Sequence, residues 1–478
     1  MYKLNRYKGI AVAGVFLAIA SCKVPAISQL PESKPLPGAY NANSTDTTNT
    51  GAVQWRSFFT DNNLISLIDT ALKNNQELLT TLQEIQIARN DIGLRQGQLL
   101  PKVGLRAGAG LEKAGRYTSQ GAGDASTDIT PGREVPDPLP DYTLGAYADW
   151  EVDIWKKLRN AKKAAVTRYL SSVEGKNFVL TNLIAEIANA YYELQSLDSQ
   201  LAIVRQSIAV QKNALEIVKV QKDAARVTEL AVQKFQAEVL SSEGLEFETL
   251  QKIRETENDL NLLLGRYPQE IVRTKDAFLN LTPATVHSGI PSQLLANRPD
   301  VKQAELDLVA AKLDVKVARA EFYPSFSISA ALGFQAFKPS YLFRYPESLI
   351  YSLAGDIAGP LINKAAIKAE FNSANARQLQ AMYNYQRVIL NAYIEVNTQL
   401  YAIDNLEKRY SLKSQEADAL TRSVDIANAL FKSARADYFE VLMTQRDALA
   451  TKLELVETKK AQLTAVTSVY RNLGGGWR

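Results

Sequence analysis

Apolar residues recur at spacings of three and four positions through much of the second quarter of the chain. Between residues 156 and 224 they continue for more than five heptads, with Gln211 as the one polar interruption. This period predicts a coiled-coil α-helix, which at 1.5 Å per residue would extend roughly 100 Å. The seam comprises Leu180, Leu183, Ile187, Ala190, Leu194, Leu197, Leu201, Val204, Ile208, Leu215 and Val218. A second seam comprises Ile389, Ala392, Val396, Ile403, Leu406, Tyr410, Leu420 and Val424.

After Pro101, and again after Pro324, the apolar period changes from helical to two. Segments of about ten residues with one apolar face are what transmembrane β-strands require, although a half-buried strand of a soluble β-sandwich shows the same alternation. The apolar positions are Val103, Leu105, Ala107, Ala109, Leu111, Leu144, Ala146, Ala148, Trp150, Phe326, Ile328, Ala330, Leu332, Phe334, Leu349, Tyr351 and Leu353. Aromatic girdles are expected from Tyr147, Trp150, Trp155, Tyr341, Phe343 and Tyr345.

The chain contains an internal duplication. Residues 72–101 align without a gap with residues 295–324, and residues 142–265 align with residues 351–474. The offset changes from 223 to 209 between these blocks, where the first half carries the longer loop. Long gapless registers joined by one insertion favour a true duplication over chance identity. Identical pairs include Asn74/Asn297, Pro101/Pro324, Glu186/Glu395, Ala225/Ala434 and Leu264-Gly265/Leu473-Gly474.

The apolar pattern of each half therefore predicts, in this order, a helix, a strand, a loop, a strand, a very long helix, a tight turn and a long helix. We place the first repeat at residues 54–265 with a β-hairpin at about 102–152, a linker at 266–290, and the second repeat at 291–478 with a β-hairpin at about 325–358. The predicted fold class is mainly α with a β-barrel part: long α-helical coiled-coil hairpins plus four transmembrane β-strands per subunit.

Four strands cannot close a barrel, and an open sheet edge in lipid would leave backbone groups without hydrogen bonds. Subunits must therefore join through their strands. Two copies would give eight strands, whose interior is filled by side chains, whereas three would give twelve, which leave a passage. A transport role favours the trimer.

The amino-acid composition disfavours most catalytic mechanisms. The chain has 55 basic and 51 acidic residues, a balance without the basic excess of nucleic-acid-binding proteins. It has one histidine, His287, and one cysteine, Cys22. These counts exclude an intramolecular disulfide and disfavour metal sites and the usual nucleophiles and acid–base groups. No motif supports an enzyme that uses carboxylates alone, so we predict no catalytic, cofactor-binding or metal-binding residues.

The N-terminus resembles a bacterial lipoprotein signal. Three basic residues precede an apolar run, Ile10 to Ala20, that is too short to span a bilayer as a mature helix. The run leads into Leu17-Ala18-Ile19-Ala20-Ser21-Cys22, which resembles a lipobox. This predicts a signal peptide at residues 1–21, an acylated Cys22, and a tether at 22–53 rich in Pro, Ser, Thr and Asn. The alternative is an ordinary signal peptide with an incidental cysteine.

Several motifs resemble those of the TolC-like outer membrane efflux factor family, in its lipoprotein branch. The most specific is Asn297-Arg298-Pro299-Asp300-Val301, followed by Ala304-Glu305, Ala310-Ala311, Ala318-Arg319-Ala320 and Phe322-Tyr323-Pro324. Trp150-Glu151-Val152-Asp153-Ile154-Trp155 resembles the family's strand-to-helix junction, and residues 55–61 with 71–75 resemble its opening segment. The resemblance implies a homotrimer with a 12-stranded barrel in the outer membrane above a 12-helix periplasmic tunnel.

The resemblance also implies partners and a role. The tunnel would dock on a periplasmic adaptor (membrane fusion) protein fed by an inner-membrane RND-type transporter, and would conduct drugs or other small molecules passively to the exterior. A duct for type I protein secretion is the alternative within the family. A periplasmic adaptor lipoprotein is disfavoured by the duplication and the amphipathic strands. A trimeric coiled-coil adhesin is disfavoured because the chain lacks a low-complexity stalk.

The resemblance also assigns two sites. The turns Ala225-Arg226-Val227-Thr228 and Ala434-Arg435-Ala436-Asp437 occupy the family's adaptor-facing tip, where glycine usually stands in place of Ala225 and Ala434. Asp425 occupies the place of a carboxylate ring that narrows the closed tunnel in some relatives, with Glu216 as its outward-facing duplicate. Plain helical-hairpin turns and an exposed helical aspartate are the alternatives.

Overall fold

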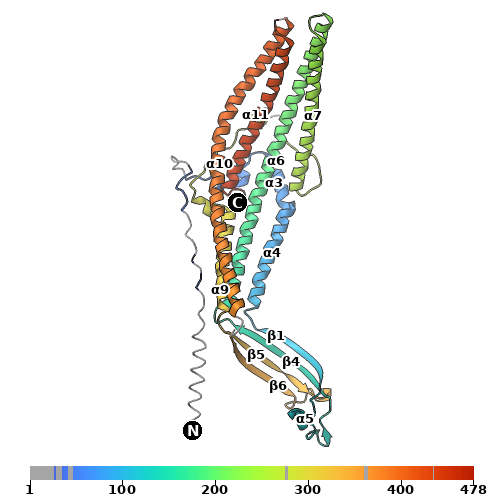
Figure 1. Cartoon of the computed structure of the whole chain (residues 1–478), viewed down its shortest axis with the longest axis vertical. Helices are drawn as coiled ribbons and strands as arrows, with labels where there is room; N and C mark the ends of the chain where they lie inside the picture. Colours follow the sequence, from blue (N-terminus) through green and yellow to red (C-terminus); the bar gives the residue numbers. More distant parts are fainter. Residues whose placement is uncertain are drawn as a thin grey trace. The chain divides into compact units, whose positions relative to one another are not determined.

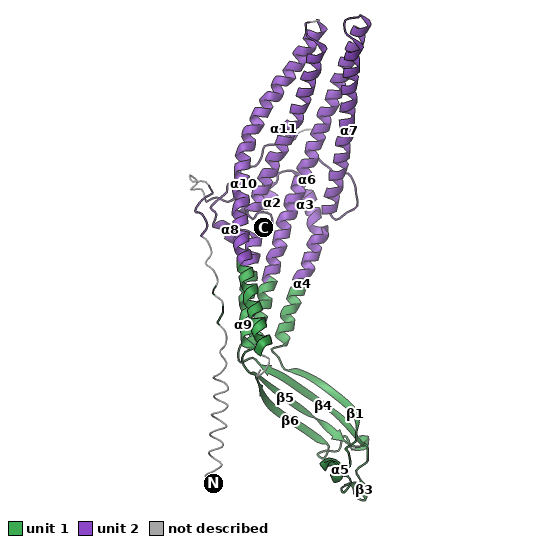
Figure 2. Cartoon of the chain, viewed as in Figure 1, with its two compact units in different colours: residues 1–31, 86–169, 306–382 green, residues 32–85, 170–305, 383–478 purple. Residues whose placement is uncertain are grey.

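The computed structural model describes residues 26–27, 29, 35–40, 47–274, 278–359, 364–433 and 435–478. The chain divides into two compact units, which Figure 2 distinguishes by colour. Unit 1 contains residues 1–31, 86–169 and 306–382, and unit 2 contains residues 32–85, 170–305 and 383–478. Each unit therefore takes segments from both halves of the duplicated sequence.

Long helices dominate the structure (Figure 1). The first seam lies on α6 (Lys157–Asp223) and the second on α10 (Lys364–Lys432). Leu183, Val204 and Val218 of the first seam are at most 4% exposed, so the coiled-coil prediction is confirmed. Within the described ranges, no helix is long and apolar enough to cross a membrane. The other helices are α2 (Trp55–Phe58), α3 (Asn62–Asn74), α4 (Gln76–Gly97), α5 (Ser119–Asp124), α7 (Glu229–Leu263), α8 (Gln293–Asn297), α9 (Pro299–Ala320) and α11 (Tyr438–Asn472), with short 3₁₀ turns η1 (Thr50–Ala52), η2 (Phe278–Asn280) and η3 (Pro339–Tyr341).

Four strands form one antiparallel sheet in unit 1, in the order β1-β4-β5-β6. All four expected strands are present, and the central pair, β4 and β5, joins the two halves of the chain. The loop between β1 and β4 also carries α5 and a small hairpin that the sequence pattern does not predict. The strands are β1 (Lys102–Glu112), β4 (Leu139–Val152), β5 (Ser325–Ala336) and β6 (Leu349–Ala358), and the small hairpin is β2 (Asp128–Thr130) with β3 (Arg133–Glu134).

The duplication is visible at two helix ends of unit 2. Helices α7 and α11 have 35 residues each, and each is followed by a glycine with positive φ, +66° at Gly265 and +88° at Gly474. In both turns the residue after the glycine donates its N–H to the carbonyl five residues earlier, at 3.0 and 2.9 Å. This bond is the signature of the Schellman motif, which closes helix C-termini.

The two turns also pack against equivalent partners. A Cβ on Gly265 would lie 2.2 Å from the carbonyl oxygen of Asn74, and one on Gly474 would lie 2.5 Å from that of Asn297. Asn74 and Asn297 are themselves duplicate positions. The same glycine turn is therefore seated against the same asparagine backbone in both repeats.

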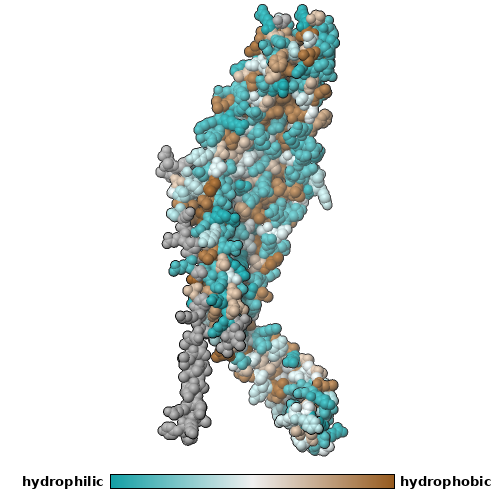
Figure 3. Space-filling view, viewed as in Figure 1, coloured by the Kyte–Doolittle hydropathy of each residue, from teal (hydrophilic) through white to brown (hydrophobic). Residues whose placement is uncertain are grey.

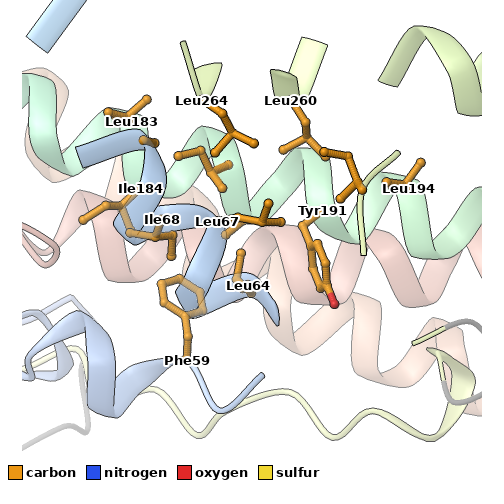
Figure 4. Close-up of a cluster of buried hydrophobic side chains, with 14 of the residues drawn as sticks. Phe59, Leu64, Leu67, Ile68, Leu183, Ile184, Tyr191, Leu194, Leu260 and Leu264 are labelled. Carbon is orange, nitrogen blue, oxygen red and sulfur yellow. The ribbon is translucent and has the colours of Figure 1, made fainter. Parts of the chain in front are cut away.

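The core of unit 2 brings the segment after residue 54 against the long helices. Figure 4 shows Phe59 and residues of α3 packed against α6 and α7. The ring of Phe58 also stacks on Tyr470 of α11, with 4.0 Å between centroids. The labelled side chains of this cluster are Phe59, Leu64, Leu67, Ile68, Leu183, Ile184, Tyr191, Leu194, Leu260 and Leu264.

The segment that links the two repeats is held by a buried ion-pair network. The side chain of Arg273 is 3% exposed and contacts Asp198 of α6 at 2.5 Å and Glu257 of α7 at 2.7 Å. Removal of one member of such a network leaves an uncompensated buried charge, which is strongly destabilising. The network therefore fixes this part of the linker to the first helical hairpin.

Candidate channel wall, tip turns and Asp425

The register of the sheet places its apolar residues on a single face. Val103 of β1 lies opposite Ala148 of β4, which lies opposite Ala330 of β5, which lies opposite Leu353 of β6. Because side chains alternate between faces along each strand, every second residue from these positions shares this face. It carries no charged residue, and its members Leu105, Leu111, Tyr351, Leu353 and Ile357 are each at least 72% exposed. A face of this kind is suited to hydrocarbon rather than water.

The opposite face is polar. It carries the carboxylates Glu112, Asp141, Asp149, Glu151 and Asp356 against the two bases Lys102 and Arg106. The remaining positions are mostly Gly, Ser, Thr and Ala, whose small side chains leave room. This face therefore has the chemistry of a water-filled channel lining with an excess of negative charge.

Two glycines bring the central strands unusually close. Gly145 of β4 and Gly333 of β5 are register partners. A Cβ on Gly333 would lie 2.6 Å from the Cα of Gly145, and a Cβ on Gly145 would lie 2.9 Å from the Cα of Gly333. Glycines inside strands mark close backbone approach and tight bends at barrel corners. The pair therefore permits a local approach of β4 and β5 that no other residue type would allow.

The residues expected to form aromatic girdles do not all lie on the apolar face. Tyr147 belongs to the polar face, opposite Gly104, where its ring occupies the space that a Cβ on Gly104 would need. The girdle prediction was therefore wrong for Tyr147. Trp150 is on the apolar face and donates its indole N–H to the carbonyl of Leu99 at 3.0 Å. Trp155 lies beyond the strand and donates to the carbonyl of Pro324 at 2.7 Å.

The strand-to-helix junction explains the motif at residues 150–155. The Asp153 carboxylate accepts the backbone N–H groups of Leu158 and Arg159 at 3.0 and 2.9 Å. It therefore satisfies two of the free donors at the start of α6. Burial alone would raise the pKa of Asp153, but these bonds and the Arg159 guanidinium lower it below its usual value.

The tip turns lie at the ends of α6 and α10. Ala225 adopts the left-handed conformation with φ of +55°, and Arg226 donates its N–H to the carbonyl of Gln221 at 2.9 Å. Arg435 makes the equivalent bond to Leu430, also at 2.9 Å. Thr228 and Asp437 are the N-cap residues of α7 and α11. Ala434 lies outside the described residues.

Replacing Ala225 by glycine should stabilise the tip. A left-handed conformation costs a residue with a Cβ roughly 1–2 kcal/mol, whereas glycine adopts it freely. We therefore expect Ala225→Gly to raise the free energy of unfolding by about 1 kcal/mol. Ala224→Gly is the matched control. Ala224 does not adopt a positive φ, so glycine gives no relief of strain there and should lower stability. Thermal unfolding of the purified variants measures both, and a loss of stability in Ala225→Gly would contradict the assignment.

Asp425 and its duplicate Glu216 have different surroundings. Glu216 pairs with Lys219 at 2.8 Å, whereas exposed Asp425 makes no ion pair with any described residue. Asp425 lines a groove of about 130 Å³ with residues of α6 and α11, among them Lys452 and Gln445. Gln445 is 4% exposed, and its Oε1 has no hydrogen-bond partner in the described part of the chain. The groove is therefore lined by the carboxylate of Asp425, the ammonium of Lys452 and the amide of Gln445.

The predicted acylation site and the predicted lack of metal sites concern other parts of the chain. Cys22 falls outside the described residues. Of the tether, Tyr40 is described and is 7% exposed, with its ring stacked 5.5 Å from that of Tyr393 on α10. Among the described residues, no group of three or more His, Cys, Asp or Glu side chains is placed to hold a metal ion.

Sequence reasoning missed two features at the tips and in the tether. Leu230 and Phe439 are duplicate positions, 58% and 54% exposed, and each is the second residue of its helix, α7 or α11. Because both duplicate positions are apolar, the sequence could have indicated a shared role for them. Tyr40 was missed because the surrounding composition is that of an unstructured tether, and an isolated aromatic has no period that would reveal its packing.

Comparison with known proteins identifies the family. A model of the outer membrane efflux protein family matches residues 67–266 and 290–475. The chain is 29% identical over 426 residues to OpmQ of Pseudomonas aeruginosa, described as a pyoverdine export outer membrane protein, covering 89% of this chain and 88% of OpmQ. It is 27% identical over 469 residues to the cation efflux system protein CusC of Escherichia coli K12, covering 97% and 98%.

Solved structures agree on the fold. A crystal structure of CusC superposes with a TM-score of 0.80 at 25% identity, covering 95% of this chain and all of that one. The open state of the MtrE outer membrane channel of Neisseria gonorrhoeae gives a TM-score of 0.81 at 20% identity, covering 95% and 98%. The fold, the two-faced sheet and the match across both repeats establish an efflux channel of the outer membrane. The chain belongs to the outer membrane efflux protein family.

Proposed function

We propose that three copies of this chain form a passive conduit, with a 12-stranded barrel and a 12-helix tunnel, for small molecules delivered by an RND-type pump and its adaptor. The observation that carries the proposal is the sheet, which has one wholly apolar face and two edge strands, β1 and β6. Edge strands in lipid need partners, and β1 of one copy beside β6 of the next satisfies both. Repetition of this pairing closes a ring.

A second apolar stripe on α10 supports assembly. Hydrophobic residues remain exposed on the surface of the helices, as Figure 3 shows for one face. Six of the seven exposed large hydrophobic residues on α10 are separated by 7, 4, 7, 11 and 14 positions, all of which return to one side of a helix. Such a stripe is the seam that a neighbouring subunit would cover. Its members are Tyr383, Leu390, Ile394, Tyr401, Leu412 and Ile426.

The stoichiometry can be tested by mass photometry of the protein purified from outer membranes in detergent. The proposal requires a particle of about three times the mature subunit mass, after subtraction of bound detergent. A stable monomer or dimer that still conducts ions in a planar bilayer would contradict it.

The exported compounds are proposed to be small molecules of several kinds. OpmQ is described as a pyoverdine exporter, CusC as part of a cation efflux system, and SrpC of Pseudomonas putida as part of a solvent efflux pump. One fold therefore serves unlike compounds. The lining found here is polar and built largely from small residues, which suits passage without a specific binding site, and we assign the choice of substrate to the pump.

The tip turns are proposed to contact the adaptor. Arg226, Val227 and Thr228 in one turn, and Arg435, Ala436 and Asp437 in the other, are exposed or half-buried. Leu230 and Phe439 add an exposed apolar residue beside each turn. Exposed apolar residues rimmed by polar ones are typical of protein interfaces. By the sequence duplication, the proposed contact also includes Ala225 and Ala434.

Cys22 is proposed to be the acylated residue that anchors each subunit to the outer membrane. The supporting observation is the lipobox-like sequence before it. Mass spectrometry should find a lipid group on Cys22 of the parent protein and none on residue 22 of the Cys22→Ser variant. Because the apolar face of the sheet would still favour lipid without the anchor, we expect the variant to retain assembled channels in the outer membrane at reduced amount. An unmodified cysteine in the parent protein would refute the assignment.

Asp425 is proposed to narrow the closed tunnel. Three-fold symmetry would bring three Asp425 carboxylates near one axis, where they attract cations. We expect Asp425→Ala to raise the single-channel conductance of reconstituted protein by about twofold or more and to weaken block by multivalent cations, since charge rings set such barriers. Glu216→Ala is the matched control and should change neither property. Equal behaviour of the two variants would reject this role.

A further inference from the structure

We propose that the loop between β5 and β6 binds the phosphorylated headgroup of the outer-leaflet glycolipid, lipopolysaccharide. The loop holds two cations against one ring. The Arg344 guanidinium lies 4.6 Å from the centroid of Tyr341, and the Lys338 ammonium lies 5.5 Å from the same centroid. Lys338 is also 5.8 Å from the ring of Phe337. Both cations therefore lie within 5.5 Å of the centroid of the Tyr341 ring.

The cluster is built into an ordered turn. The hydroxyl of Ser348, a residue only 5% exposed, donates to the carbonyl of Tyr341 at 2.5 Å, and its backbone N–H donates to that of Arg344 at 2.9 Å. Gln335 at the end of β5 donates its N–H to the carbonyl of Ser348 at 2.9 Å. These bonds hold the loop in place, so an anion that binds between the cations does not have to order it first.

Neither cation is neutralised within the described part of the chain. Lys338 and Arg344 make no ion pair there, and the one carboxylate of the loop, Glu347, is exposed and makes none either. The neighbouring loop between β1 and β4 differs in this respect. Its Lys113 and Arg116 both lie 3.7 Å from the carboxylate of Asp137. Two unpaired cations beside one ring favour an anion as the missing partner.

The chain order places this loop at the outer surface. β5 begins shortly after α9 and β6 ends shortly before α10, so the loop at residues 337–348 lies at the end of the sheet opposite to the helices. The helices of an outer-membrane efflux channel are periplasmic, which leaves this end at the external leaflet. Within unit 1 the ring of Phe343 also packs on Phe334, at 5.8 Å between centroids.

The contact with Phe334 selects the side of the sheet on which the ligand lies. Phe334 belongs to the apolar face, so Phe343 continues that face into the loop. Phe343 and Tyr345 are 67% and 74% exposed. Exposed aromatic residues beside cations suit the boundary between acyl chains and charged headgroups. A phosphate carried by an acylated lipid therefore fits this surface better than a free phosphate.

The test measures binding of fluorescent lipid A with two phosphates to the full-length protein in detergent. Lys338→Gln with Arg344→Gln should weaken binding by roughly tenfold or more, because two charge-assisted contacts are lost. Lys113→Gln with Arg116→Gln is the matched control and should leave affinity unchanged. The charge-preserving exchange Lys338→Arg with Arg344→Lys should retain binding and confirms that any loss comes from charge rather than misfolding.

Two competitors separate the sources of the phosphate. Lipid A with one phosphate should bind more weakly than the form with two, and inorganic phosphate should not displace the probe at millimolar concentration. Equal binding by both lipids, equal loss in the two double variants, or displacement by inorganic phosphate would each overturn the proposal.

Discussion

Gly474→Ala is expected to prevent stable folding of unit 2. The residue has φ of +88°, and a Cβ there would lie 2.5 Å from the carbonyl oxygen of Asn297 and 2.7 Å from its carbon. The left-handed conformation costs alanine roughly 1–2 kcal/mol, and overpacking against a backbone that cannot move away adds about 1–3 kcal/mol. We expect the assembled protein to be absent from outer membranes, or to dissociate at a much lower temperature on heating.

The duplicate turn and an open glycine supply the controls. Gly265→Ala should have the same effect, because its Cβ would meet the carbonyl oxygen of Asn74 at 2.2 Å. Gly244 lies inside α7 with nothing within 4 Å of a built Cβ. Gly244→Ala should therefore raise stability by up to about 1 kcal/mol through helix propensity. Similar midpoints for Gly474→Ala and Gly244→Ala in thermal dissociation would refute the account of the turns.

Leu353→Arg is expected to block insertion of the strands. Leu353 lies on the apolar face in the middle of β6 and is 78% exposed. An arginine facing lipid near the bilayer midplane costs a transmembrane barrel about 2–4 kcal/mol per subunit. The neighbouring Ser352 belongs to the polar face. Ser352→Arg should therefore assemble normally, since its side chain would extend into water.

Immunoblots of outer-membrane fractions, with and without heating, measure assembly of both variants. We expect little assembled Leu353→Arg protein and a nearly normal amount of the Ser352→Arg protein. If the two arginines are tolerated equally, the sheet does not face lipid on its apolar side.

Periodic features of this protein were predictable because they repeat. The seam on α6, the four strands and the duplication each rest on many residues, so single exceptions such as Gln211 do not hide the pattern. The alternation of residues along the strand also predicts, correctly, that Tyr147 lies on the polar face. Ala146, Ala148 and Trp150 define the apolar face, and an odd-numbered residue between them must belong to the other face. The girdle assignment followed residue type where it should have followed the period.

Long-range pairings left no local signal. The pairing of β4 with β5 joins strands almost two hundred residues apart, and only their shared apolar period suggests that they belong to one sheet. The role of Arg298 is a similar case. Its motif was visible, but its guanidinium contacts Glu395 at 2.9 Å and the carbonyl of Asn472 at 3.0 Å, partners far away in the sequence. Such contacts depend on how the repeats fold back, which no local pattern encodes.

The two repeats also use different side chains to hold equivalent backbone carbonyls. Asn75 is the duplicate of Arg298, and it donates to the carbonyl of Leu263 at 2.9 Å, the duplicate of Asn472. An amide and a guanidinium thus hold equivalent carbonyls. The longer arginine side chain also reaches Asp300 at 2.7 Å and Glu395, so the second repeat gains ion pairs that the first does not have at this position.

The most direct test of the central claim is the pattern of solvent access along β6. Single cysteines are placed at each position from 349 to 357 and treated in intact cells with a small water-soluble thiol reagent, with the parent chain as background. The account predicts alternation, with labelling at the polar-face positions of Ile350, Ser352, Ala354 and Asp356 and protection at the apolar-face positions of Leu349, Tyr351, Leu353 and Ile357. Uniform labelling of both sets would contradict a channel wall with lipid on one side and water on the other.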